Sequence, residues 1–188
     1  MKSTPLKHKT RLAARTPLKR SKIDSKATKP PKKTSRRKIK NKGYKPPSWF
    51  TSIKPGLHGN TPAQKRYWRL VSIAVRVEDY ERYGRCVGCS RTFAHWSEAQ
   101  AGHFKAWSVS YGFFKFERKN LAAICSFCNH ISDGPINANF LYEMQRRHGE
   151  NFKEWIEREN LKHKDEKMEV WEIVERAQPL YEKYSMYL

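Results

Sequence analysis

The longest amphipathic pattern in the chain runs from Thr61 to Gly84. Its apolar residues recur at helical spacing: Tyr67, Leu70, Val71, Ala74, Val75 and Tyr80. Such spacing is typical of a helix with one buried face. Thr61 suits the N-cap, Pro62 the first helical position and Gln64 the end of a capping box, and Gly84 suits the C-terminal stop. The pattern predicts a core helix, to which we assign no chemistry.

Further amphipathic patterns lie in the last third of the chain. One helix is predicted from Asn137 or Asn139, as N-cap, to a stop at Gly149, and a short helix follows in NFKEWIEREN. The stretch 165–184 predicts a longer helix that Pro179 should kink or end. These helices are expected to support the core, and the last one either packs on it or makes a homodimer contact.

Charge divides the chain of 188 residues, whose net charge is +21, into two parts. Residues 1–47 hold 18 of the 39 Lys and Arg residues, six prolines and a single acid, Asp24, which leaves a net charge of +17. A segment of this composition cannot bury enough apolar surface to offset chain entropy. We therefore predict a disordered basic arm over 1–47 and one folded domain over 48–188.

The arm predicts a partner that carries phosphates, because clustered cations neutralise phosphates and release their counterions. Arg36, Arg37 and Lys38 are the arm residues expected to contact nucleic acid. A solubility tail or a ribosome-like extension is the alternative. A membrane-surface arm is disfavoured, because no amphipathic apolar stripe accompanies the charges. The sequence shows neither a membrane-spanning run nor a secretory signal, so a cytoplasmic location is expected.

Four cysteines form two C-x-x-C pairs, Cys86 with Cys89 and Cys125 with Cys128, with 35 residues between the pairs. Each pair places two thiolates on one tight turn, and two such turns complete the tetrahedral S₄ site preferred by structural zinc. A redox pair or buried free cysteines are the alternatives. Because a closed S₄ site has no open coordination position, this zinc is expected to stabilise the fold and not to catalyse.

Candidate catalytic residues lie between the cysteine pairs and directly after the second. QAGHFKAW places His103 on a short extended run, Asn120 precedes the second pair, and Asn129 and His130 follow Cys128. A lone histidine in such a place is more often structural than catalytic. Here, however, the order is C-x-x-C, a histidine on a strand, NL, and then C-x-x-C-N.

This order resembles the HNH, or ββα-metal, endonucleases, in which a hairpin and a helix surround one divalent ion. The motifs AGHF, NLAAICSFCNH and DG, followed by a helix that contains tyrosine, are more closely similar to the phage NinG (Rap) recombination endonuclease family. The resemblance covers roughly Cys86 to Gly149. It implies an α+β fold: a zinc-stapled ββα-metal core with flanking helices, preceded by the basic arm.

The resemblance also implies roles. His103 matches the histidine that deprotonates the attacking water, and Asn120 the residue that fixes the hairpin loop. Asn129 matches a ligand of the catalytic Mg²⁺ or Mn²⁺, with His130 as a neighbouring candidate. The implied substrates are branched recombination intermediates, such as Holliday junctions and D-loops. If the chain is phage-encoded, the expected place of action is the cytoplasm of the bacterial host.

One position departs from the HNH pattern. Many HNH enzymes have an aspartate metal ligand just before the catalytic histidine, and this chain has Gly102 there. Asp133 is the nearest carboxylate in sequence, with Glu117 and Glu98 as alternatives, although Asp133 in the sequence Asp-Gly-Pro also fits a simple turn. Phosphate oxygens and water could equally complete the coordination shell of a hard cation.

Cations interleave with aromatic residues between His103 and Asn120. We expect four of them to contact phosphate: Lys105, Lys115, Arg118 and Lys119. The aromatic residues suit either stacking on bases or a small core, and for the phenylalanines we favour the core.

The main hypothesis is therefore a metal-dependent DNA endonuclease. The alternative is a non-catalytic zinc protein that binds or anneals DNA, which Gly102 supports. An RNA-binding or ribosome-associated zinc protein fits the arm but leaves His103 and Asn120 unexplained.

Overall fold

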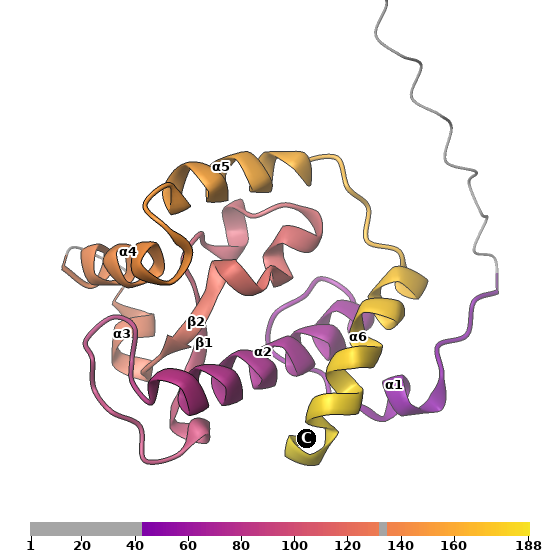
Figure 1. Ribbon diagram of the computed structural model, residues 1–188. Helices are drawn as coiled ribbons and strands as arrows, with labels where there is room; N and C mark the ends of the chain where they lie inside the picture. The colour runs from indigo at the N-terminus through magenta and orange to yellow at the C-terminus, as the bar shows by residue number, and fades with distance from the viewer. Residues whose placement is uncertain (1–42, 132–134) are drawn as a thin grey trace, which may run out of the picture. The chain divides into compact units, whose positions relative to one another are not determined.

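The computed structural model describes residues 43–131 and 135–188. In Figure 1 the described chain is a set of helices around one two-stranded sheet. The helices are α1 (Ser48–Ser52), α2 (Pro62–Tyr83), α3 (Ser126–His130), α4 (Pro135–His148), α5 (Phe152–Lys162) and α6 (Val170–Tyr184), and the strands are β1 (Gln100–His103) and β2 (Leu121–Ile124). Single 3-10 turns fill much of the segment between the strands. The predicted α+β class is confirmed. The described helices include none that is both long and apolar enough to cross a membrane.

Helix α2 begins and ends where its sequence predicts. The Thr61 hydroxyl accepts a hydrogen bond from the Gln64 backbone N–H at 3.2 Å, and Gly84 ends the helix in the left-handed region with φ +64°. The Gln64 side chain accepts from the backbone N–H of Asn60 at 2.7 Å, and not from that of Thr61. The predicted capping box therefore reaches one residue further back.

The sheet brings together the two segments that carry the predicted site. Strand β1 pairs antiparallel with β2, so that Gln100 lies opposite Ile124 and His103 opposite Leu121. Every residue of β2 is buried, and α3 follows it after the single residue Cys125. Helix α2 contacts both strands and also α6 (Figure 1). His103 thus stands at the end of a strand, as predicted.

Two predictions about where the later helices begin and end are wrong: an asparagine N-cap for the helix that stops at Gly149, and an end at Pro179; a kink at Pro179 stays a prediction. Helix α4 begins at Pro135, so Asn137 and Asn139 lie inside it and neither is its N-cap. A proline costs little at the first helical position, because the N–H that it lacks would have no intrahelical partner there. Helix α6 continues through Pro179 to Tyr184. The carbonyl that Pro179 leaves without a helical donor belongs to Glu175, and since both residues are exposed, water can reach it.

The core consists of adjoining hydrophobic clusters. One joins α1, α2 and α6 and includes Phe113 and Phe116, and another surrounds the cysteines and includes Phe114 together with side chains of α4 and α5. The predicted core role of these three phenylalanines is confirmed. The arm prediction for residues 1–42, including Arg36, Arg37 and Lys38, lies outside the described residues, and so does Asp133.

Candidate active site and metal centre

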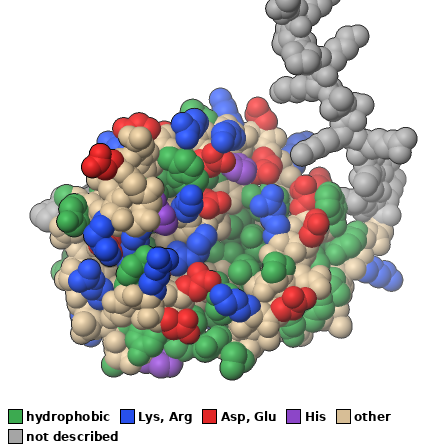
Figure 2. Space-filling model, in the orientation of Figure 1, with side chains coloured by type: hydrophobic (Ala, Val, Ile, Leu, Met, Phe, Trp, Pro, Cys, Tyr) green, Lys and Arg blue, Asp and Glu red, His purple; other side chains and the backbone are tan. Residues whose placement is uncertain are grey.

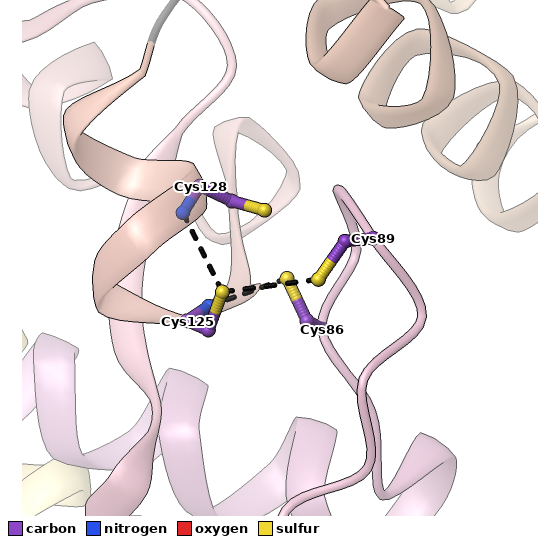
Figure 3. Close-up of side chains that lie close together, drawn as sticks. All are labelled: Cys86, Cys89, Cys125 and Cys128. Atoms are coloured by element: carbon purple, nitrogen blue, oxygen red, sulfur yellow. Dashed lines mark hydrogen bonds between the residues drawn. The ribbon is translucent and has the colours of Figure 1, made fainter.

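Four cysteine sulfurs converge between the loop after α2 and the start of α3 (Figure 3). All four Sγ atoms lie within 4.8 Å of one another, and those of Cys89 and Cys125 are 3.8 Å apart. Ligands of a tetrahedral zinc with Zn–S bonds of roughly 2.3 Å are separated by roughly 3.8 Å. A disulfide would need roughly 2 Å. The spacing therefore fits four ligands of one ion.

Backbone N–H groups point at these sulfurs. Gly88 and Cys125 donate to Cys86 Sγ at 3.3 Å, and Cys128 donates to Cys125 Sγ at 3.4 Å. Burial raises the pKa values of the Cys86 and Cys128 thiols. Clustered thiolates therefore need a cation to be stable here, and the cysteines can hold a structural zinc with no coordination position left open.

His103 is held in a single orientation at the end of β1. Its ring stacks on Trp68 at 4.9 Å and 16°, and it makes edge contacts with Trp107 and His58. His103 Nε2 lies 3.0 Å from the carbonyl oxygen of Lys115. A carbonyl only accepts, so Nε2 carries the proton and donates, and Nδ1 keeps its lone pair. Burial lowers the pKa of His103 to about 4, so the ring is neutral near pH 7.

Asn120 closes the loop that separates the two strands. It is fully buried, its Oδ1 accepts from the Lys105 N–H at 2.7 Å, and its Nδ2 donates to the Lys105 carbonyl at 3.1 Å. Phe104 N also donates to the Asn120 carbonyl at 2.9 Å. Asn120 therefore fixes the backbone beside His103, and we classify it as a positioning residue.

Asn129 and His130 each use one polar side-chain atom in a hydrogen bond that orients the side chain. The other polar atom of each is available to a ligand. Asn129 Nδ2 donates to Gln100 Oε1 at 2.7 Å, which leaves Asn129 Oδ1 as the acceptor atom. His130 Nδ1 lies 2.6 Å from the Ser126 carbonyl and must donate to it, which leaves Nε2 with the lone pair. An amide oxygen and an imidazole nitrogen on one short helix are thus available to a ligand.

Both residues line a cleft of about 490 Å³. One wall is the segment 54–58 with His58, and another is the α2 face that carries Trp68, Arg69, Ser72 and Arg76. The start of β1 and the two α3 residues complete it. His103 is not a lining residue, but it contacts Trp68 and His58, which are. Lys54 and the two arginines are the cations of the lining, and no described carboxylate belongs to it.

Packing explains why glycine precedes His103. A Cβ atom on Gly102 would lie 2.5 Å from Ile124 Cγ2 and 3.3 Å from Asn129 Oδ1. An aspartate therefore has no room at this position. Glu98 accepts from the Ala94 N–H and Glu117 from the Lys119 N–H, and neither lines the cleft. The described residues that line the cleft thus offer a hard divalent cation an amide and imidazoles but no carboxylate, and such a ligand set fits the cation incompletely.

The four cations predicted to contact phosphate lie elsewhere than the cleft. Lys105 pairs with Glu157 at 2.7 Å, and Arg118 pairs with Glu78 and Asp79. A phosphate would have to displace these carboxylates. Lys115 Nζ sits 4.8 Å from the Trp107 ring centre, and Lys119 Nζ sits 5.0 Å from that of Trp155, in cation–π contacts. Their contact with phosphate remains a prediction.

The family model described as "Bacteriophage Lambda NinG protein" matches residues 5–184. The chain belongs to the NinG family. Neither the curated proteins nor the solved structures gave a match. The resemblance to NinG proteins is confirmed, and the matched range extends it beyond Cys86–Gly149 to include α2, α6 and most of the basic arm.

Sequence reasoning missed part of the cleft of this NinG-family chain. It assigned no chemistry to α2 and did not single out His58. Between Tyr67 and Val77 the polar residues at 69, 72 and 76 repeat at intervals of three and four, and all other residues of this stretch are aromatic or aliphatic. That second periodic face was the signal that could have identified the arginine wall.

Proposed function

We propose that this NinG-family protein is a metal-dependent DNA endonuclease that hydrolyses phosphodiester bonds in branched recombination intermediates such as Holliday junctions and D-loops. The observation that carries the proposal is the placement of a neutral, oriented histidine, His103, next to a cleft whose charged lining is wholly basic. The order β1, β2, α3 around it supports the proposal, because a strand–strand–helix order is what a ββα-metal enzyme would need. The preference for branched DNA rests on the family resemblance alone.

In this mechanism each side chain has a limited task. The lone pair on His103 Nδ1 takes the proton of the attacking water, while the Lys115 carbonyl holds the ring through Nε2. Asn120 keeps the loop closed, so that this carbonyl stays in place. The cations of the cleft attract the phosphodiester and balance the charge that develops on it.

A bound Mg²⁺ or Mn²⁺ would stabilise charge on the phosphate and on the leaving oxygen. Asn129 Oδ1 and His130 Nε2 are its candidate ligands among the described residues. Asp133 remains the candidate carboxylate from the sequence, and phosphate oxygens and water are the alternative.

The test compares wild type, His103→Ala and His95→Ala on labelled four-way junctions and matched duplex, with Mg²⁺, Mn²⁺ or EDTA. His95 is an exposed histidine and serves as the control. We expect metal-dependent cutting by wild type and His95→Ala and a loss of at least about 100-fold in His103→Ala, the usual contribution of a general base. Because the pKa of His103 is about 4, its protonation should not limit the rate between pH 6 and 8. Intact DNA with wild type under every metal condition would exclude the proposal.

A second function, a zinc protein that binds or anneals DNA without cutting it, is favoured by one observation. The cleft has no carboxylate among its described lining residues, and Gly102 leaves no room for one. In that case wild type and His103→Ala would bind junctions equally, and neither would cut them.

A further inference from the structure

The α2 wall of the cleft carries two arginines that pair with no carboxylate of the described residues. Arg69 and Arg76 lie two helical turns apart with Ser72 between them, so that all three share one face of α2. Across the part of the chain that the structure describes, neither guanidinium forms an ion pair, because the carboxylate pairs there belong to other cations.

Their surroundings show that these charges are not simply solvated. Arg69 Nε is buried and has no hydrogen-bond partner among the described residues. Arg76 donates from Nε to the Ser72 carbonyl at 3.1 Å, and its guanidinium lies 4.8 Å from the Trp96 ring centre, so the group is held in place. Burial, and after it the charge of Arg69, lower the pKa of Arg76. Two like charges kept close and partly desolvated are an arrangement that an anion would relieve.

The last turns of α2, directly after Arg76, provide a contrast. There Asp79 forms ion pairs with Arg118 and Arg147. Glu78 forms ion pairs with Arg118 and Lys183. Carboxylates thus neutralise Arg118, Arg147 and Lys183. The described lining of the cleft contains no carboxylate. On the face drawn in Figure 2, acidic and basic side chains are likewise interspersed and do not gather by sign. The cleft is therefore distinguished by two partly buried arginines in a lining that contains no described carboxylate.

We propose that Arg69 and Arg76 bind the backbone phosphates of a DNA strand that lies in the cleft, and so guide the strand past Asn129 and His130. A guanidinium offers paired N–H donors that match phosphate oxygens, and the described lining of the cleft contains no carboxylate that would compete for them. The inference deepens the proposed function, since it uses the same cleft, but it concerns binding and holds whether or not the strand is cut.

The experiment measures binding of full-length protein to a fluorescent four-way junction by anisotropy, in EDTA, over a series of salt concentrations. The variants are Arg69→Gln and Arg76→Gln, and the control is Arg82→Gln. Arg82 is an exposed arginine on the same helix, with no carboxylate partner among the described residues and outside the cleft lining. Each variant removes one positive charge, and the basic arm is common to all of them.

Each of Arg69→Gln and Arg76→Gln should weaken binding about 5- to 10-fold and reduce the slope of log K against log salt by about 0.9, the value for one phosphate that is no longer neutralised. Arg82→Gln should change affinity less than about twofold. Thermal midpoints and zinc content establish that the variants are folded, and Arg69→Met and Arg76→Met, which also remove the charge but keep an unbranched side chain, replace any variant that is not.

Affinities and salt slopes equal to those of wild type or Arg82→Gln would overturn the phosphate site, even if the DNA is cut. Weaker binding by the two cleft variants, with no cutting by wild type, would support the phosphate site and reject the nuclease. The two proposals can therefore fail separately.

Discussion

At the scale of single residues, packing at Gly102 leaves no space for the aspartate that many HNH enzymes have at this position. The contact that a Cβ would make is with Ile124 Cγ2, the branch methyl of a residue that is 2% exposed and lies on β2 two positions from Ala122, the partner of Gly102. Crowding of this kind in a packed core costs about 1–3 kcal/mol. We therefore expect Gly102→Ala to lower the free energy of unfolding by about that amount, measured by urea denaturation of the zinc-loaded protein.

The Ile124 side chain provides the control for this prediction. If the cost arises from the Cγ2 contact, Ile124→Ala should remove it, and the double variant should be more stable than the sum of the single changes predicts. Additive effects would show that Gly102 is needed for another reason. Aspartate at 102 should be at least as destabilising as alanine, because it brings the same Cβ and a charge.

The identities of the site residues were easier to predict from the sequence than the contacts that orient them. His103, Asn120, Asn129 and the four cysteines could be selected from their order along the chain, because that order alone resembles a known motif. The hydrogen bonds that orient them come from residues with no signal of their own, such as the Lys115 carbonyl and the Gln100 amide. Their spatial neighbours depend on how the strands pair, which local sequence does not reveal.

At the scale of elements, one buried carboxylate joins four segments. Asp79 of α2 is 1% exposed, accepts from the Ala123 N–H of β2 at 2.7 Å and binds Arg118 and Arg147. The Arg147 side chain is 4% exposed and paired inside the protein. Such a group ties α2, β2, the turn before β2 and α4 together.

Asp79→Asn should therefore be destabilising, by up to about 3–5 kcal/mol, because it removes one of the two carboxylates that neutralise the buried Arg147 guanidinium and leaves Glu143 as the other. The comparison is Glu159→Gln, which removes the exposed ion pair with Lys162 and should cost less than about 1 kcal/mol. Chemical denaturation of the two variants checks the difference. Equal losses would mean that Asp79 is not central to the fold.

Element boundaries were predictable only where the signal is local. Thr61 and Gly84 mark the ends of α2 because a cap and a left-handed glycine act on the adjacent backbone. Asn139 resembled an N-cap in sequence, but its side chain donates to the Gly88 carbonyl at 3.1 Å and so braces the first cysteine turn. That contact spans distant parts of the chain, and no local pattern encodes it.

At the scale of the whole molecule, the cysteine cluster connects the end of α2 to the start of α3, and its surrounding hydrophobic cluster includes side chains of α4 and α5. Zinc binding should therefore be coupled to folding. We expect wild type to contain one zinc per chain, and Cys125→Ser, or wild type treated with a strong chelator, to lose its near-ultraviolet circular dichroism and its cooperative unfolding. A metal-free protein with an unchanged thermal midpoint would contradict the S₄ site.

Charge is the other property that belongs to the whole chain. Residues 1–42 contain 17 of the 39 Lys and Arg residues, and the NinG match includes most of this segment. If the arm neutralises phosphates, its deletion should weaken junction binding and flatten the salt dependence by about 0.9 in slope for each phosphate that the arm had neutralised. The zinc content and thermal midpoint of the remaining chain should not change.

A shuffled arm of the same composition separates charge from sequence in this test. Purely electrostatic contacts depend on the number of cations and not on their order, so the shuffled protein should keep the affinity and slope of wild type. The arm contains the sequence TPLK twice, at residues 4–7 and 16–19. Weaker binding on shuffling would show that these repeats or the Arg36–Lys38 cluster are recognised specifically. An unchanged salt slope after deletion would show that the arm does not contact phosphate, and the cleft arginines would then account for a larger share of the affinity.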